Sequence, residues 1–175
     1  LPRVAALQAH PLVQAEHPLG SYLHELHARH AECTTGEVAS YIPELAQADP
    51  ALFGVAIATV DGRVYTVGDC DHTFTIQSIS KPFAYALALH DNGLDGVLDK
   101  VGVEPTGNGA DWVSQYQQGG RPFNPMINAG AITATSLVRD EPGMPRIRRI
   151  LDLMSACAGR PLEIDEAVVA SERET

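Results

Sequence analysis

The sequence predicts an α/β fold of the α+β kind, in which helices accompany an antiparallel pair of strands. Three observations support this prediction. The chain has 175 residues, 45% of them hydrophobic, which is enough to bury a core as one globular domain or a large piece of one. A β-branched apolar run is joined to an alternating run through Asp61-Gly62. Most other apolar side chains recur at helical spacing.

The first predicted elements are helical. Residues 1–35 read as an N-terminal helical segment, in which side chains recur at three- and four-residue steps: Leu19, Tyr22, Leu23, Leu26 and His30. The polar stretch Thr34-Thr35-Gly36 ends this segment. A short helix follows, with apolar residues on one side: Val38, Tyr41, Ile42 and Leu45. Pro43 fits this helix only in its first turn, where the missing N–H is tolerated.

A β-hairpin follows the short helix. Residues 53–60 form a β-branched apolar run, and residues 63–68 alternate between polar and apolar side chains. Asp61-Gly62 stands between the two runs and can adopt the positive φ angles of a tight primed turn. We therefore predict two antiparallel strands with Asp61-Gly62 at the tip.

Helices and one long loop make up the rest of the chain. A helix is expected after residue 71 and ends at Asp91-Asn92-Gly93. Residues 94–128 are rich in glycine and proline and predict a loop, which the apolar Trp112, Val113 and Phe123 mark as ordered and functional. Small and apolar residues predict a buried helix over 129–138, and residues 147–158 predict an amphipathic helix that ends at Gly159.

The composition excludes several classes of function. Twelve Lys and Arg against 22 Asp and Glu give a net charge of −10, whose field repels nucleic acid and anionic membrane surfaces. The apolar stretches are far shorter than the roughly 20 residues that span a bilayer. The N-terminus lacks a signal-peptide pattern, so a cytoplasmic protein is expected. Cys33, Cys70 and Cys157 are widely spaced, which predicts reduced and mostly buried thiols.

The clearest chemical motif is Gln77-Ser-Ile-Ser-Lys81, an S-x-x-K at the start of a predicted helix. The three-residue spacing places Ser78 and Lys81 on one helix face, so the amine can reach the hydroxyl. A lysine that burial keeps partly neutral can take the serine proton and create a nucleophile, and residues 74–76 are apolar enough to provide that burial. The alternative interpretation is that the serine only caps the helix.

A second candidate is Asn128, which stands before the small residues of a predicted helix. Its amide offers both a donor and an acceptor, which suits holding an amide or an amino acid in place. The competing interpretation is a helix cap, and the residues leave both open.

Two further clusters have ordinary explanations. The histidines at positions 10, 17, 24, 27 and 30 lack the companions and spacing of a metal site, so a histidine-rich amphipathic face is the better interpretation. Three arginines, Arg146, Arg148 and Arg149, lie near Glu141 and Asp152 in the sequence. They predict a solvated helix face with pairing along the helix.

Five strings of the sequence resemble the serine-dependent glutaminase family, in order and close to its spacing. They are residues 36–46 with Tyr41-Ile-Pro43, residues 77–82 with the S-x-x-K, residues 103–107, residues 121–132, and the closing Ser171-Glu-Arg-Glu174. The resemblance covers residues 36–175 almost without interruption. It implies two parts, an N-terminal helical segment over 1–35 and the N-terminal portion of a catalytic domain over 36–175.

The resemblance implies a fold like that of serine β-lactamases and D,D-peptidases, with an antiparallel sheet flanked by helices and a mostly helical subdomain. It implies hydrolysis of L-glutamine to L-glutamate and ammonia through a serine acyl-enzyme, without metal or organic cofactor, in a homo-oligomer, dimer or tetramer. By this resemblance, Ser78 matches the nucleophile, Lys81 its general base and Tyr41 an active-site tyrosine. Asn128 and Glu172 match substrate-binding positions, with Glu172 able to pair with the α-ammonium of glutamine.

The sequence departs from the family in two places. Ala110-Asp111 stands where the family usually has Phe-Asn, and Thr175 falls inside the family's Ser-Glu-Arg region. Family members are longer, so the strands that complete the sheet and further site residues are expected outside this chain. The S-x-x-K alone would also permit a β-lactamase or D,D-peptidase-like acyl transferase. An inactive amino-acid-binding module or subunit is the third alternative.

Overall fold

The computed structural model describes residues 17–106 and 120–174. These residues form two compact units, one made of residues 17–75 and 163–174 and the other of Ile76–Leu162. The expected α/β fold is confirmed as helices with a small antiparallel sheet. The predictions for the first 16 residues, for Gly107 and Ala110-Asp111, and for Trp112 and Val113 lie outside the described residues.

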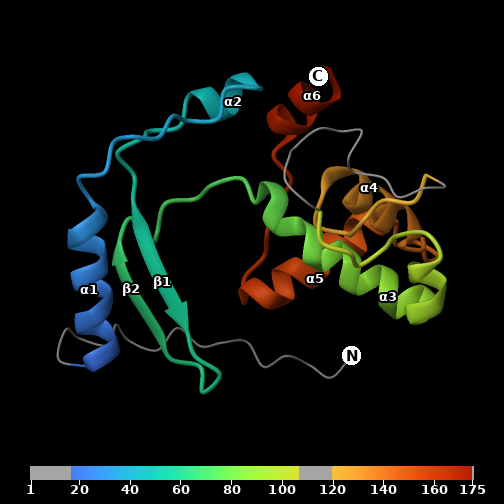
Figure 1. The fold of residues 1–175 in the computed structure, drawn as a ribbon, viewed down its shortest axis with the longest axis horizontal. Helices are drawn as coiled ribbons and strands as arrows, with labels where there is room; N and C mark the ends of the chain where they lie inside the picture. Colours follow the sequence, from blue (N-terminus) through green and yellow to red (C-terminus); the bar gives the residue numbers. More distant parts are fainter. Residues whose placement is uncertain (1–16, 107–119, 175) are drawn as a thin grey trace. The chain divides into compact units, whose positions relative to one another are not determined.

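In the first unit, helix α1 (Pro18–His30) packs against a hairpin of β1 (Gly54–Ala58) and β2 (Val64–Gly68) (Figure 1). The strands pair antiparallel, with Gly54 opposite Gly68 and Ala58 opposite Val64. Leu23 of α1 and Tyr65 of β2 are buried. The predicted helix is confirmed over 18–30, and it packs against the hairpin.

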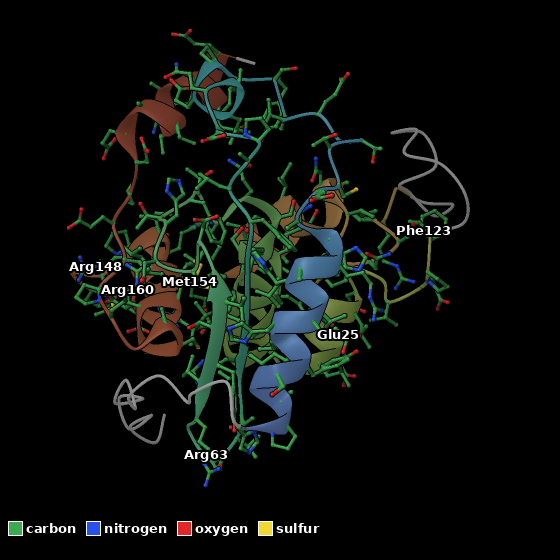
Figure 2. The ribbon with its side chains drawn as sticks, turned by 90° about the vertical axis from the view of Figure 1, so that its left-hand side faces the viewer. Glu25, Arg63, Phe123, Arg148, Met154 and Arg160 are labelled. Carbon is green, nitrogen blue, oxygen red and sulfur yellow. The ribbon has the colours of Figure 1, made fainter. Side chains whose placement is uncertain are left out.

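The hairpin turn differs from the predicted primed turn. Among the described residues, positive φ outside glycine occurs only at Gln77, so Asp61 is not in the left-handed region. Gly62 is, with φ of 84°, and its N–H donates to the Thr59 carbonyl at 2.9 Å. The Thr59 N–H in turn donates to the Arg63 carbonyl, which makes a three-residue loop with a left-handed glycine at its end. Arg63 marks this tip in Figure 2.

Two histidines, His27 of α1 and His17 just before the helix, connect α1 to the hairpin segment. His27 Nε2 donates to the Phe53 carbonyl at 3.1 Å, and its ring stacks on that of Phe53 with centroids 4.7 Å apart. The His17 ring accepts the Leu19 N–H at the start of α1 and lies 5.0 Å from the Tyr65 ring. Among residues 17–106 and 120–174, no group of three or more His, Cys, Asp or Glu side chains is arranged to hold a metal ion.

The first unit also contains α2 (Pro43–Ala46) and α6 (Glu166–Glu174), which contact each other (Figure 1). Pro43 is the first residue of α2, which confirms the position expected for it. The α6 helix was not predicted. Asp165 precedes it and accepts the backbone N–H groups of Ala167 and Val168 at 3.1 Å each, as an N-cap does.

The second unit consists of η1, a 3₁₀ turn (Gln77–Ser80), followed by α3 (Lys81–Leu98), α4 (Asn128–Leu137) and α5 (Arg146–Ala158). Gly93 has φ of 72° and interrupts α3 where the sequence predicts an end. The expectation that residues 94–128 begin as a loop is wrong for its first part, because the chain turns helical again up to Leu98. The predicted helices over 129–138 and 147–158 are confirmed within one residue at their ends.

The core of the second unit lies between these helices. Its buried residues are Ala84, Leu87, Ala88, Val97, Ala134, Val138 and Ile150. Helices α3 and α4 make the most extensive contact. No described helix is both long and apolar enough to cross a membrane.

Three expectations about exposure are wrong. Arg149 is 8% exposed instead of solvated, because its guanidinium pairs with the equally buried Asp91 of α3. Phe74 is 76% exposed, so its ring does not provide the burial that was expected for the Lys81 amine. Cys33 and Cys157 are exposed free thiols, although Cys70 is partly buried and its thiol points at the backbone carbonyls of Val55 and Val67.

Candidate active site

Ser78 lies in the 3₁₀ turn that leads into α3, and Lys81 is the first residue of that helix. The Lys81 N–H donates to the Ser78 carbonyl, so the two residues are one 3₁₀ turn apart. Residues three apart in such a turn nearly eclipse each other, which places both side chains on one face. Ser78 is exposed and Lys81 is partly buried. A hydrogen bond between the Ser78 hydroxyl and the Lys81 amine stays a prediction.

The backbone just before Ser78 is strained. Gln77 has φ of 44°, the left-handed region, and is the one non-glycine residue with positive φ among the residues that the structure describes. A side chain in this region costs about 1–2 kcal/mol, and such strain concentrates at functional sites. Nothing in the sequence around Gln77 signals this conformation, since glycine or asparagine is the usual marker. The strain sets Ser78 at an abrupt turn ahead of the helix.

Ser80, the other serine of the motif, has a structural role. Its Oγ donates to the Gln77 carbonyl at 2.7 Å, across the same strained turn. The Ser80 hydroxyl therefore already bonds to the local backbone. Ser78 is the more exposed residue of the two. The two serines thus form a matched pair within four residues.

Lys81 and Asn128 are brought together from positions far apart in the sequence. Lys81 Nζ donates to Asn128 Oδ1 at 2.7 Å. Each residue is the first of its helix, so the amine and the amide meet where α3 and α4 both begin. The helix N-termini carry partial positive charge, which favours an anion that forms beside them.

Asn128 does not cap α4, so the interpretation of this residue as a helix cap is excluded. The residue before α4 is Ile127, and no side chain of that position or of Asn128 provides a cap. The Asn124 Oδ1 accepts instead from the N–H groups of Met126 and Ile127, at 3.0 and 3.2 Å. Asn124 Nδ2 donates to the Glu104 carbonyl at 2.9 Å. The role of Asn124 was not predicted, although an Asn-Pro pair before a helix is a turn signal.

A glycine lets this loop come close to α4. A Cβ at Gly130 would collide with the Asn124 carbonyl and approach the Pro125 Cα to 3.1 Å. Only a residue without a side chain permits this close approach. Gly130 therefore lets the loop of Asn124 and Pro125 pack directly against the first turn of α4.

Tyr41 and Glu172 form a second pair, within the first unit. The Tyr41 hydroxyl donates to Glu172 Oε1 at 2.9 Å, between residues 131 positions apart in the sequence. Tyr41 precedes α2 and Glu172 lies in α6. The hydrogen bond to the Glu172 carboxylate raises the pKa of Tyr41 above its usual value. Both side chains are exposed and accessible to a ligand.

The structure pairs four of the five predicted site residues in two separate contacts, Lys81 with Asn128 and Tyr41 with Glu172. It sets Ser78, the fifth, one turn ahead of Lys81. Each contact lies within one unit. The second unit presents a hydroxyl, an amine and an amide at the starts of two helices. These are the groups that an acyl-transfer reaction requires.

The known proteins that this chain resembles belong to one family. The family model described as Glutaminase matches residues 36–175. A glutaminase of Microcystis aeruginosa is 45% identical over 159 residues, which are 91% of this chain and 47% of that protein. A glutaminase of a Nostoc species is 48% identical over 158 residues, 90% of this chain and 47% of that protein.

A solved structure has the same fold in the shared region. It is described as a probable glutaminase from Bacillus subtilis complexed with 6-diazo-5-oxo-L-norleucine. Its TM-score is 0.75 at 31% identity, and the match covers 95% of this chain and 50% of that one. The chain therefore spans about half the length of the relatives that it matches.

Proposed function

This chain belongs to the glutaminase family, and on that premise we propose that it carries the nucleophilic half of an enzyme that hydrolyses L-glutamine to L-glutamate and ammonia. The contact between Lys81 Nζ and Asn128 Oδ1 is the observation that carries the proposal. It joins the amine of the S-x-x-K motif to the amide that the resemblance assigns to substrate binding. A fortuitous S-x-x-K would not require these two residues to meet.

The proposed reaction begins at Ser78. Neutral Lys81 takes the proton of the Ser78 hydroxyl, and Oγ attacks the side-chain carbonyl carbon of glutamine. The resulting oxyanion is stabilised by the Ser78 N–H and by the positive end of the helix. Lys81 then gives its proton to the leaving nitrogen, and ammonia departs. Water, activated in the same way, hydrolyses the γ-glutamyl ester and regenerates the serine.

The proposed roles of the other residues concern recognition. Asn128 Oδ1 faces Lys81, so its Nδ2 group is left to donate to an oxygen of the substrate. Glu172 pairs with the α-ammonium of glutamine, and the Tyr41 hydroxyl orients the Glu172 carboxylate. The proposal requires neither a metal nor an organic cofactor.

The proposal extends to organisation and setting. Residues 36–175 would be the N-terminal portion of the catalytic domain, in agreement with the matched range, and residues 1–35 a preceding helical segment. Free thiols at Cys33, Cys70 and Cys157 support a cytoplasmic protein. The resemblance alone supports a homo-oligomer, which light scattering of the intact protein would measure.

A pair of serine variants tests the nucleophile. In the intact protein, Ser78→Ala should abolish ammonia release from glutamine, because no other hydroxyl stands one turn before Lys81. Ser80→Ala should keep most of the activity, since it loses only a hydrogen bond to the Gln77 carbonyl, worth about 0.5–1.5 kcal/mol of stability. Equal loss of ammonia release in the two variants would contradict the assignment.

A further inference from the structure

Hydrogen bonds join helices α3 and α4 near both of their ends. The bonded residues are separated by nearly the same number of positions in the sequence at each end. At their starts, Lys81 Nζ donates to Asn128 Oδ1, 47 residues away. Towards their ends, Asn92 Nδ2 donates to the Leu137 carbonyl at 2.7 Å, 45 residues away. The two helices therefore run parallel, with polar contacts at each end of the pair. At the far end Asp91 of α3 also accepts the N–H of Arg139, two residues beyond α4, at 2.8 Å.

The Asn92 amide serves both helices. The same Nδ2 group donates to the Ala88 carbonyl of α3 at 2.9 Å and to the Leu137 carbonyl of α4. Leu137 is the last residue of α4, and carbonyls in the last turn of a helix have no partner within it. One partly buried side chain thus fastens the end of α4 to the turn of α3 just before Gly93.

Small side chains contribute much of the packing between these contacts, beside the larger Leu87 of α3. Ala84 and Ala88 of α3 and Ala134 of α4 are buried in the shared core. Alanine ridges are shallow, so they interlock less than the larger side chains that usually fix the relative position of two helices. Sliding of α4 along α3 is consequently resisted by the polar contacts at the two ends.

We infer that Asn92 is a positioning residue for the candidate active site, because its bond to Leu137 holds the register of α3 and α4 that brings Asn128 to Lys81. The inference rests on the proposed function for its effect on catalysis. Asn92 itself acts from the opposite end of the helix pair, 11 residues along the chain from Lys81. Errors of about 1 Å in catalytic groups can cost a hundredfold in rate, so a small slip of register is sufficient.

A double-mutant cycle tests this inference in the intact protein. Asn92→Ala should lower kcat/KM for glutamine about tenfold in the wild-type background. In an Asn128→Ala background the same change should cost less than about twofold, because the contact that Asn92 aligns is already gone. Equal losses in the two backgrounds would overturn the inference, because a general loss of stability acts in both. An unchanged rate in Asn92→Ala would also overturn it.

Thr133→Val is the matched control. It removes a side-chain hydrogen bond to the Ala129 carbonyl within α4 alone, so it should leave kcat/KM within about twofold of wild type. If Asn92→Ala does not fold, Asn92→Ser replaces it, since the shorter hydroxyl can serve only one of the two carbonyls.

A spectroscopic measurement separates this inference from the proposed function. The side-chain amide resonance of Asn128 should shift in Asn92→Ala and stay in place in Thr133→Val, whether or not glutamine is a substrate. An unmoved Asn128 resonance in Asn92→Ala would refute the positioning role. Failure of the proposed function would appear instead as no ammonia release by the wild-type protein.

Discussion

Lys81 determines how the Asn128 amide is turned. Lys81 Nζ donates to Asn128 Oδ1, so the carbonyl oxygen of the amide is the atom that faces the lysine. The amide nitrogen of Asn128 then faces away from the lysine with two protons to donate. A carboxylate or carbonyl oxygen of the substrate can accept these hydrogen bonds. A second amide nitrogen or an ammonium group cannot accept them.

In the proposed function, the Glu172 carboxylate pairs with the α-ammonium of glutamine. A charged hydrogen bond to the α-ammonium is worth about 1.5–3 kcal/mol, or about 10- to 100-fold in kcat/KM. Glu172→Gln should therefore lose this factor with glutamine. It should change little with glutaric acid monoamide, which is glutamine without the α-amino group.

Measuring both substrates on both proteins tests this selectivity. Equal losses with the two substrates would mean that Glu172 acts on the chemistry or the fold. Tyr41→Phe is the companion variant, because it removes the hydrogen bond to Glu172 and leaves the carboxylate in place. Its effect should be smaller than that of Glu172→Gln and specific for glutamine in the same way.

At the scale of elements, a buried ion pair joins α3 to α5. Arg149 donates to both Asp91 carboxylate oxygens, at 2.6 and 2.8 Å, and to the Arg139 carbonyl at 2.7 Å. Asp91 also accepts the Arg139 N–H at 2.8 Å. The Arg149 guanidinium is the main cause that holds the pKa of Asp91 well below its usual range. These bonds tie the segment after α4 to both neighbouring helices.

Removing one partner of this pair should be costly. Asp91→Asn leaves the buried Arg149 charge without its main partner, which predicts a loss of about 3–5 kcal/mol in the free energy of unfolding at pH 7. Asp152→Asn breaks the exposed pair with Arg148 and should cost under about 1 kcal/mol. Urea unfolding of the two variants measures both values, and similar losses would contradict the special role of Asp91.

The pH dependence follows from the lowered pKa of Asp91. The folded state binds the Asp91 proton less tightly than the unfolded state, so the stabilisation is present above the unfolded pKa of about 3.9. It is lost as the pH falls further towards the folded pKa. The difference in stability between wild type and Asp91→Asn should therefore be constant near neutral pH and shrink below about pH 4. A constant difference down to pH 2 would contradict this linkage.

At the scale of the whole molecule, local signals predicted the elements well. The Asp61-Gly62 pair, Pro43 and Gly159 each mark an end or a turn that the structure contains. These residues act through their own backbone, so a single sequence reveals them. Helix α6 was missed, although Asp165 followed by Glu166 carries the signal of a helix start.

Local sequence signals of this kind did not predict contacts between residues far apart in the sequence. The charged run at Arg146–Arg149 resembles a solvated face, and only the fold brings Asp91, 58 residues away, to Arg149. The same holds for Lys81 with Asn128 and for Asn92 with Leu137. The strain at Gln77 has no sequence marker at all. The resemblance named Ser78, Lys81, Tyr41, Asn128 and Glu172 as one set, whereas their partners required coordinates.

Covalent trapping tests the claim that Ser78 is the nucleophile of a glutamine-hydrolysing enzyme. In 6-diazo-5-oxo-L-norleucine a diazomethyl ketone replaces the side-chain amide of glutamine, so an activated serine oxygen can displace dinitrogen and remain attached. The intact wild-type protein, treated with this reagent and digested, should carry one adduct on the peptide that contains Ser78 when analysed by mass spectrometry. Ser80→Ala should carry the same adduct, and Ser78→Ala none. An adduct on another residue, or one that persists in Ser78→Ala, would contradict the claim.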